Sequence, residues 1–202
     1  MIALFRRYRY FYLTAFILIV LGLIIQLFTE KGELVLALNA LHNEFLDSVF
    51  MIITKMGELA GGIIVFLLLL IFGSKKYVLA FVLSIVVTTG ASQGLKHTIF
   101  KQERRPIVAF ENLKPVDSLE RHRTNSFPSG HTTASFTFMT LLAIGLKKNW
   151  IQIGAPVLGA LIGLSRVYLG QHYLNDIIAG AILGLLLTSM VLMFIENRFK
   201  EE

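Results

Sequence analysis

Long apolar blocks dominate the pattern of hydrophobic and polar residues along the chain. An α-helix needs roughly 20 residues to cross a bilayer, and three blocks come close to this length: residues 11–28, 77–95 and 177–195. Three shorter blocks would reach it if their polar ends extended to the membrane surface or the bundle interior: residues 59–72, 132–146 and 151–169. The pattern therefore predicts an all-α integral membrane bundle of six transmembrane helices, forming a single domain over residues 1–202.

A different pattern follows the first predicted span. In residues 34–56, apolar side chains recur at near-helical spacing, and polar side chains occupy many of the positions between them. The apolar set comprises Leu38, Leu41, Phe45, Val49, Ile52 and Met56. This predicts one or two short amphipathic helices on the outer face of the membrane. The alternative is that the neighbouring spans extend into water.

The composition agrees with a membrane protein and excludes several classes. Hydrophobic residues make up 55% of the chain and charged residues only 16%, which is too apolar for an ordinary soluble domain. The absence of cysteine excludes disulfides and thiolate metal sites. The positive charges are divided among several loops, which does not favour nucleic acid binding. We expect membrane lipids around the chain, and no obligate protein partner is indicated.

The Lys and Arg residues predict an orientation once one segment is set apart. Six spans place both termini on one side with nine of these residues, and ten lie on the other side. Seven of those ten fall within residues 96–123, and the remaining count predicts cytoplasmic termini. A basic loop on the outer side opposes the usual bias, so we expect it to bind an anion. A solvated loop neutralised by its own carboxylates is the alternative.

Chemistry is expected on this outer side, where residues 96–130 would form an active-site loop. The run Pro128-Ser129-Gly130-His131 is typical of a helix start. Ser129 can cap the helix, and Gly130 lets an anion approach the free backbone N–H groups. His131 would stand beside that anion and could donate a proton to a leaving oxygen.

A second cluster precedes the last predicted span. His172 and Asp176 are four residues apart, so they share one helix face, where the carboxylate can orient the imidazole. Arg166, six residues upstream of His172, could hold an anion beside the pair. These residue types favour phosphoryl chemistry. Two His and one Asp could also ligate a metal, but the neighbouring cations disfavour it.

These segments resemble the motifs of the type 2 phosphatidic acid phosphatase superfamily of integral membrane lipid phosphatases. The family motifs are Lys-(six residues)-Arg-Pro, Pro-Ser-Gly-His and Ser-Arg-(five residues)-His-(three residues)-Asp. The second motif matches fully at residues 128–131, and the third matches fully at Ser165, Arg166, His172 and Asp176. The resemblance covers roughly residue 54 to the C-terminus.

The first motif departs from the family pattern. An Arg-Pro pair is present at residues 105–106, but eight residues separate Lys96 from Arg105 instead of six. We assign Lys96 and Arg105 to the phosphate, because the end of the third span fits the family's local pattern. Lys101 and Arg104 are the alternates for Lys96, and Arg104 is also the alternate for Arg105.

The resemblance implies a phosphatase that needs no metal or other cofactor and works through a phosphohistidine. In these roles His172 attacks phosphorus, Asp176 supports His172, and His131 protonates the leaving oxygen. The phosphoryl oxygens would be held by Lys96, Arg105, Ser129, Gly130 and Arg166.

The expected substrate is a lipid phosphate on the extracytoplasmic face, above all undecaprenyl pyrophosphate or phosphatidylglycerol phosphate, with phosphatidic acid as a further possibility. A lipid phosphotransferase of the same superfamily is one alternative function. A lipid flippase or transporter is an alternative from another class.

Overall fold

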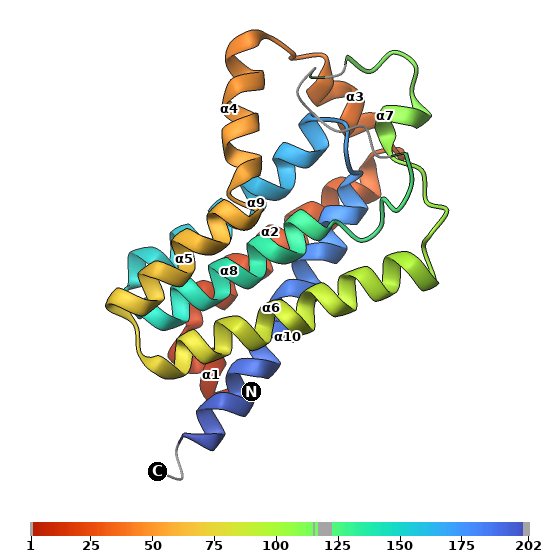
Figure 1. Cartoon of the computed structure of the whole chain (residues 1–202). Helices are drawn as coiled ribbons and strands as arrows, with labels where there is room; N and C mark the ends of the chain where they lie inside the picture. Colours follow the sequence, from red (N-terminus) through yellow and green to blue (C-terminus); the bar gives the residue numbers. More distant parts are fainter. Residues whose placement is uncertain (1, 115, 117–122, 200–202) are drawn as a thin grey trace.

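The computed structural model describes residues 2–114, 116 and 123–199 (Figure 1). Within these residues every regular element is a helix, which confirms the predicted all-α class. Part of the predicted active-site loop, residues 115 and 117–122, lies outside the described residues. The helices are α1 (Ile2–Arg7), α2 (Arg9–Phe28), α3 (Glu33–Asn39), α4 (Glu44–Lys55), α5 (Leu59–Phe72), α6 (Lys75–Thr98), α7 (Pro106–Ala109), α8 (Gly130–Leu146), α9 (Asn149–Tyr168) and α10 (Leu174–Arg198).

Each of the six predicted apolar blocks forms a helix, but the helices differ in their capacity to span a membrane. By length and composition, α2, α6, α9 and α10 can each cross a bilayer. The 14-residue α5 meets the same criterion only together with α4, and the two helices are bent by 53° at their break. The described residues thus contain four candidate spans, or five with the bent pair. The count of six stays a prediction, because α8 has only 17 residues.

The short helix α8 packs against α5, α6, α9 and α10 at the centre of the bundle (Figure 1). Its buried threonines bond to its own backbone: Thr133 Oγ1 donates to Ser129 O at 2.9 Å and Thr137 Oγ1 to Thr133 O at 2.9 Å. Helix α10 approaches this backbone through Gly180 and Gly184, where a Cβ would clash with Ser129 O and Thr133 O. The N-terminal turn of α8 and that of α10 are therefore held side by side.

The segment predicted to be amphipathic forms two short helices, α3 and α4, as expected. Both pack against α9, and α4 is fastened there by Tyr168, whose hydroxyl donates to Asp47 Oδ1 at 2.5 Å. The Phe50 ring stacks on Tyr168 with 4.2 Å between centroids. In Figure 1 both helices lie at the end of the bundle that carries α7, away from α1 and the end of α10. Their position on the membrane surface stays a prediction.

Candidate active site

A cavity of about 600 Å³ lies between the α4–α5 break and the ends of α6, α8 and α9. Six of the residues assigned from sequence line it together: Lys96, Arg105, Gly130, His131, Arg166 and His172. They come from three stretches of the chain, residues 96–105, 130–131 and 166–172. The cavity therefore combines several cations, the first turn of a helix and two imidazoles.

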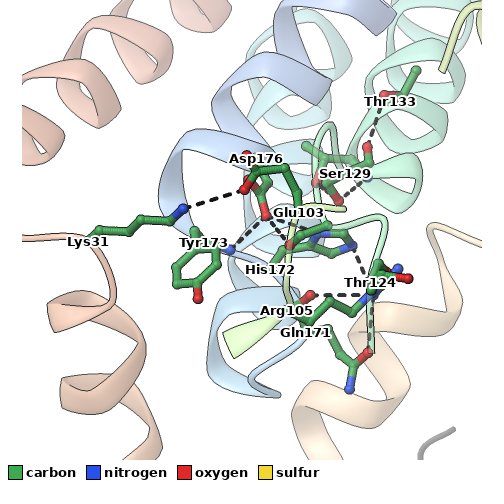
Figure 2. A network of polar contacts seen from close by, with 12 residues as sticks. Lys31, Glu103, Arg105, Thr124, Ser129, Thr133, Gln171, His172, Tyr173 and Asp176 are labelled. Atoms are coloured by element: carbon green, nitrogen blue, oxygen red, sulfur yellow. Dashed lines mark hydrogen bonds and ion pairs between the residues drawn. The ribbon is translucent and has the colours of Figure 1, made fainter. Parts of the chain in front are cut away.

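His172 lies in the connection between α9 and α10, and only 1% of the residue is exposed. The prediction that it shares a helix face with Asp176 is wrong, because α10 begins at Leu174, but the two side chains still meet across the start of this helix. The His172 Nδ1 is 3.3 Å from Asp176 Oδ2, which also accepts a hydrogen bond from the Tyr173 backbone N–H at 3.0 Å (Figure 2). With a proton on Nδ1 donated to the carboxylate, the imidazole keeps its lone pair on Nε2. Asp176 thus orients His172 from behind, on the side away from the cavity.

The surroundings of His172 favour its neutral form. Burial, followed by the positive charges of Arg105, Arg166 and Lys96, lowers the pKa of His172 well below its usual value. The Nε2 atom lies 3.4 Å from Arg105 Nη1, which can donate to the lone pair of the neutral ring. The His172 ring is therefore held in its neutral form, with Nε2 facing a cation.

Arg105 is anchored on three sides and is 6% exposed. Its Nε donates to Thr124 O at 3.1 Å, and its Nη1 donates to Gln171 Oε1 at 3.2 Å (Figure 2). The alternate Arg104 is exposed and lines a separate surface pocket beside Lys31. Of the two neighbouring arginines, the structure places Arg105 at the cavity.

Lys96 reaches the cavity despite its irregular distance from Arg105. It continues a buried stripe on α6 at four-residue intervals after Ser84, Thr88 and Ser92, and it is only 7% exposed. Its Nζ lies 3.6 Å from the point that a Cβ on Gly130 would occupy. Turns after α6 close with hydrogen bonds from Phe100 N to Leu95 O and from Glu103 N to Phe100 O, and they take up the longer connection.

The first turn of α8 has the geometry expected of its sequence. Ser129 is the N-cap, and its Oγ accepts from the Thr132 N–H at 3.3 Å. Ser129 is completely buried behind Gly130, which lines the cavity. The open backbone N–H groups of this turn and their helix dipole suit an anion.

Arg166 is 3% exposed and is held by helix α4. Its Nη1 donates to Thr54 Oγ1 at 2.9 Å, whereas its buried Nε has no hydrogen-bond partner among the described residues. A buried guanidinium N–H without a partner is costly, so an anion in the cavity would stabilise it.

Three contacts of the site were missed at the sequence level. Glu58 Oε1 is 2.9 Å from His131 Nε2, Thr54 binds Arg166, and Ser126 Oγ donates to Asp176 Oδ2 at 2.5 Å. Glu58 interrupts the apolar pattern just before α5, and this charged residue at the start of an apolar block could have marked it as a candidate for the site. Nothing local marks Thr54 or Ser126, because their partners lie 112 and 50 residues away along the chain.

Ser126→Ala should lower kcat by about 10-fold while leaving KM within about twofold. The lost hydrogen bond to a charged group is worth roughly 1.5–3 kcal/mol, part of which fixes the orientation of Asp176 behind His172. Steady-state phosphate release by the purified variant measures the effect. Ser48→Ala, at an exposed position of α4, serves as the control. A variant with unchanged kcat would show that Ser126 does not support the pair.

The donor atoms around the cavity suit an anion more than a metal ion. Among the described residues, no three His, Asp or Glu side chains converge as metal ligands would. The cavity walls instead present ammonium and guanidinium groups, whose geometry fits phosphoryl oxygens.

Comparison with known proteins places this site in a family. Residues 77–200 match the PAP2 superfamily, and the chain belongs to it. The undecaprenyl-diphosphatase BcrC of Bacillus subtilis is 32% identical over 165 residues, covering 79% of this chain and 78% of that protein. The phosphatidylglycerophosphatase B of the same organism is 39% identical over 104 residues, which cover 46% of this chain and only 51% of that protein.

The fold comparison agrees with the family assignment. The crystal structure of Aquifex aeolicus LpxE superposes with a TM-score of 0.71 at 28% identity, covering 81% of this chain and 94% of that chain. Together with the apolar helices, the family makes the chain a multi-pass membrane protein and a phosphatase-type hydrolase. The resemblance seen in the sequence is thereby confirmed.

Proposed function

We propose that the protein is a metal-independent phosphatase that hydrolyses a lipid phosphate or pyrophosphate through a phosphohistidine at His172. The observation that carries the proposal is the buried His172–Asp176 pair, which faces Lys96, Arg105 and Arg166 across one cavity. A neutral nucleophile opposite a set of fixed cations is what phosphoryl transfer requires, because this reaction depends mainly on positioning and charge stabilisation.

In the first step the His172 Nε2 lone pair attacks phosphorus, and the bond from phosphorus to the leaving oxygen breaks. His131 gives its proton to that oxygen, an effect typically worth about 10²–10⁴ in rate. Arg105 exchanges its contact with Nε2 for a phosphoryl oxygen, which frees the lone pair. Asp176 stabilises the positive charge that develops on the His172 ring.

In the second step water attacks the phosphohistidine, and the P–N bond breaks. His131, now neutral, takes the proton from the attacking water. The cations Lys96, Arg105 and Arg166, together with the α8 N-terminus at Ser129 and Gly130, hold the three phosphoryl oxygens throughout. Each charge-assisted contact contributes roughly 1.5–3 kcal/mol.

The proposed substrate is undecaprenyl pyrophosphate or phosphatidylglycerol phosphate. Relatives with these activities in their names support the choice. An apolar groove of about 400 Å³ between α5, α6 and α8 also supports it, because Gly57, Glu58 and Ala134 line both this groove and the cavity. A phosphate in the cavity could thus keep the adjoining hydrocarbon in an apolar environment.

The proposal includes a single domain with six spans, both termini in the cytoplasm and the site on the extracytoplasmic side. Helix α10 begins beside His172, so its 25 residues carry the C-terminal end to the opposite end of the bundle. There it lies at the same end as α1 (Figure 1). The positive charges near both termini favour the cytoplasmic side for that end.

Purified protein in detergent should release phosphate from undecaprenyl pyrophosphate or phosphatidylglycerol phosphate, and excess EDTA should change the rate by less than about twofold, because charge stabilisation comes from side chains. Colorimetric phosphate release across a lipid panel measures both effects. Loss of activity with EDTA and recovery with a divalent ion would contradict the metal-independent mechanism.

Product analysis with and without an acceptor lipid separates hydrolysis from phosphotransfer, and no release at all would favour a transporter.

A further inference from the structure

The α4–α5 break brings a carboxylate into the cationic cavity. Glu58 lies at this break, and its Oε1 is 2.9 Å from His131 Nε2. Among the described residues that line the cavity, Glu58 is the one carboxylate, whereas Lys55, Lys96, Arg105 and Arg166 line it as cations. A negative charge in a site for an anion opposes substrate binding. The Glu58 carboxylate must therefore contribute something else to the site, and its contact with His131 indicates what that is.

The backbone of the break is shaped to make this contact. A Cβ on Gly57 would lie 2.7 Å from Ile162 Cγ2 and 3.2 Å from His131 O, so a glycine is needed for the break to pack on the first turn of α8. A Cβ on Gly61 would clash with Met56 O, across the bend. The position of Glu58 against His131 thus follows from the packing of the break.

The charges that face His131 come from every element around the cavity. They are Lys55 on α4, Glu58 at the break, Lys96 on α6, Arg105 in the α6–α8 connection, Arg166 on α9 and His172 before α10. Burial, followed by the positive charges of Arg166 and Lys96, lowers the pKa of His131 to about 4, although a general acid must carry its proton in the reaction. Glu58 is the group that offsets these effects in part, because its carboxylate contacts the ring.

We propose that Glu58 is a positioning residue that raises the proton affinity of His131 against the surrounding cations and directs its Nε2–H toward the cavity. This rests on the proposed function, in which His131 is the general acid. When substrate binds, the His131 Nε2–H exchanges its hydrogen bond to Glu58 for one to the leaving oxygen, and the proton is then transferred to that oxygen. Glu58 stays ionised throughout, and no bond to it forms or breaks. With a side chain that is 47% exposed, it has room to withdraw from the incoming phosphate.

The test compares the pH dependence of kcat/KM for the full-length wild type and Glu58→Gln, with phosphatidylglycerol phosphate in mixed micelles as substrate. Its alkoxide leaving group depends on a proton donor. The alkaline limb reports the acid in the free enzyme, and an adjacent opposite charge shifts such a group by about one pH unit or more. We expect the alkaline limb of Glu58→Gln to move down by about one unit. The variant would lose about 10-fold at pH values above the wild-type limb and less than about threefold at pH values well below it.

A second readout separates this role from a structural one. Loss of a negative charge should lower the inhibition constant of inorganic phosphate in Glu58→Gln, whereas a distorted cavity would raise it. Glu58→Asp retains the charge and should keep most of the wild-type alkaline limb. It also serves as the test variant if Glu58→Gln does not fold. Glu111→Gln, an exposed carboxylate outside the cavity, should match the wild type.

The proposal would be overturned by an alkaline limb in Glu58→Gln that coincides with that of the wild type, or by a loss of equal size at every pH. A shift of the limb that persists when His131 is also replaced by alanine would overturn it too, because Glu58 is expected to act only through that ring. An inactive wild type, or a fully active His172→Ala variant, would instead contradict the proposed function.

Discussion

Replacing His172 with alanine is expected to lower phosphate release by at least about 10⁴-fold, because the atom that accepts the phosphoryl group is lost. The variant should still fold, since Asp176 keeps its hydrogen bonds to Ser126 and the Tyr173 N–H. The measurement is the single-turnover rate in detergent with the lipid found in the substrate panel. His97→Ala, an exposed histidine next to Lys96, is the matched control. Activity of His172→Ala near that of the control would contradict the nucleophile assignment.

The same variant tests the electrostatic environment of the ring. The pKa of His172 in the folded protein lies well below its usual value, so the unfolded chain binds a proton at this residue at a higher pH than the folded chain does. Stability of the wild type should therefore fall as the pH drops below about 6.5, the usual pKa of histidine. His172→Ala removes this group and should lose less stability over the same interval. Thermal unfolding at pH 7 and pH 5 measures the difference.

Replacing His131 with alanine is expected to lower the rate on a lipid phosphate by about 10²–10⁴-fold, the usual contribution of a general acid. The loss should be much smaller for the first step with p-nitrophenyl phosphate, because its leaving group is stable as an anion. The second step still lacks its base, so phosphoenzyme should accumulate. A burst of nitrophenol close to one equivalent of enzyme, followed by slow turnover, is the expected trace.

Two outcomes would contradict this role of His131. Equal losses on both substrates would place His131 in binding or folding, and a rate without a burst would argue against a base in the second step. The phosphorus trapped in His131→Ala should be stable to alkali and released by acid, as expected for a phosphohistidine. His172→Ala, which lacks the acceptor, should trap none and is the matched control.

Sequence alone was sufficient wherever the physical cause is local. A run of apolar side chains predicts a membrane helix regardless of its partners, and all six predicted blocks are helical. Ser129 caps α8, because capping is a property of a single helix turn. His172 contacts Asp176 because the two residues are close along the chain, although His172 lies in the connection just before α10. Their catalytic roles remain predictions until the variants are measured.

Only the tertiary structure decided which cations and carboxylates meet. Whether Lys96 reaches the cavity depends on the turns after α6, and the choice of Arg105 over Arg104 depends on which side chain points inward. Thr54 and Ser126 act across 112 and 50 residues, and such pairings leave no periodic signal. Glu58 meets His131 because the α4–α5 bend packs on α8. Local patterns determine helices and caps, whereas the electrostatics of the site follow from contacts between distant segments.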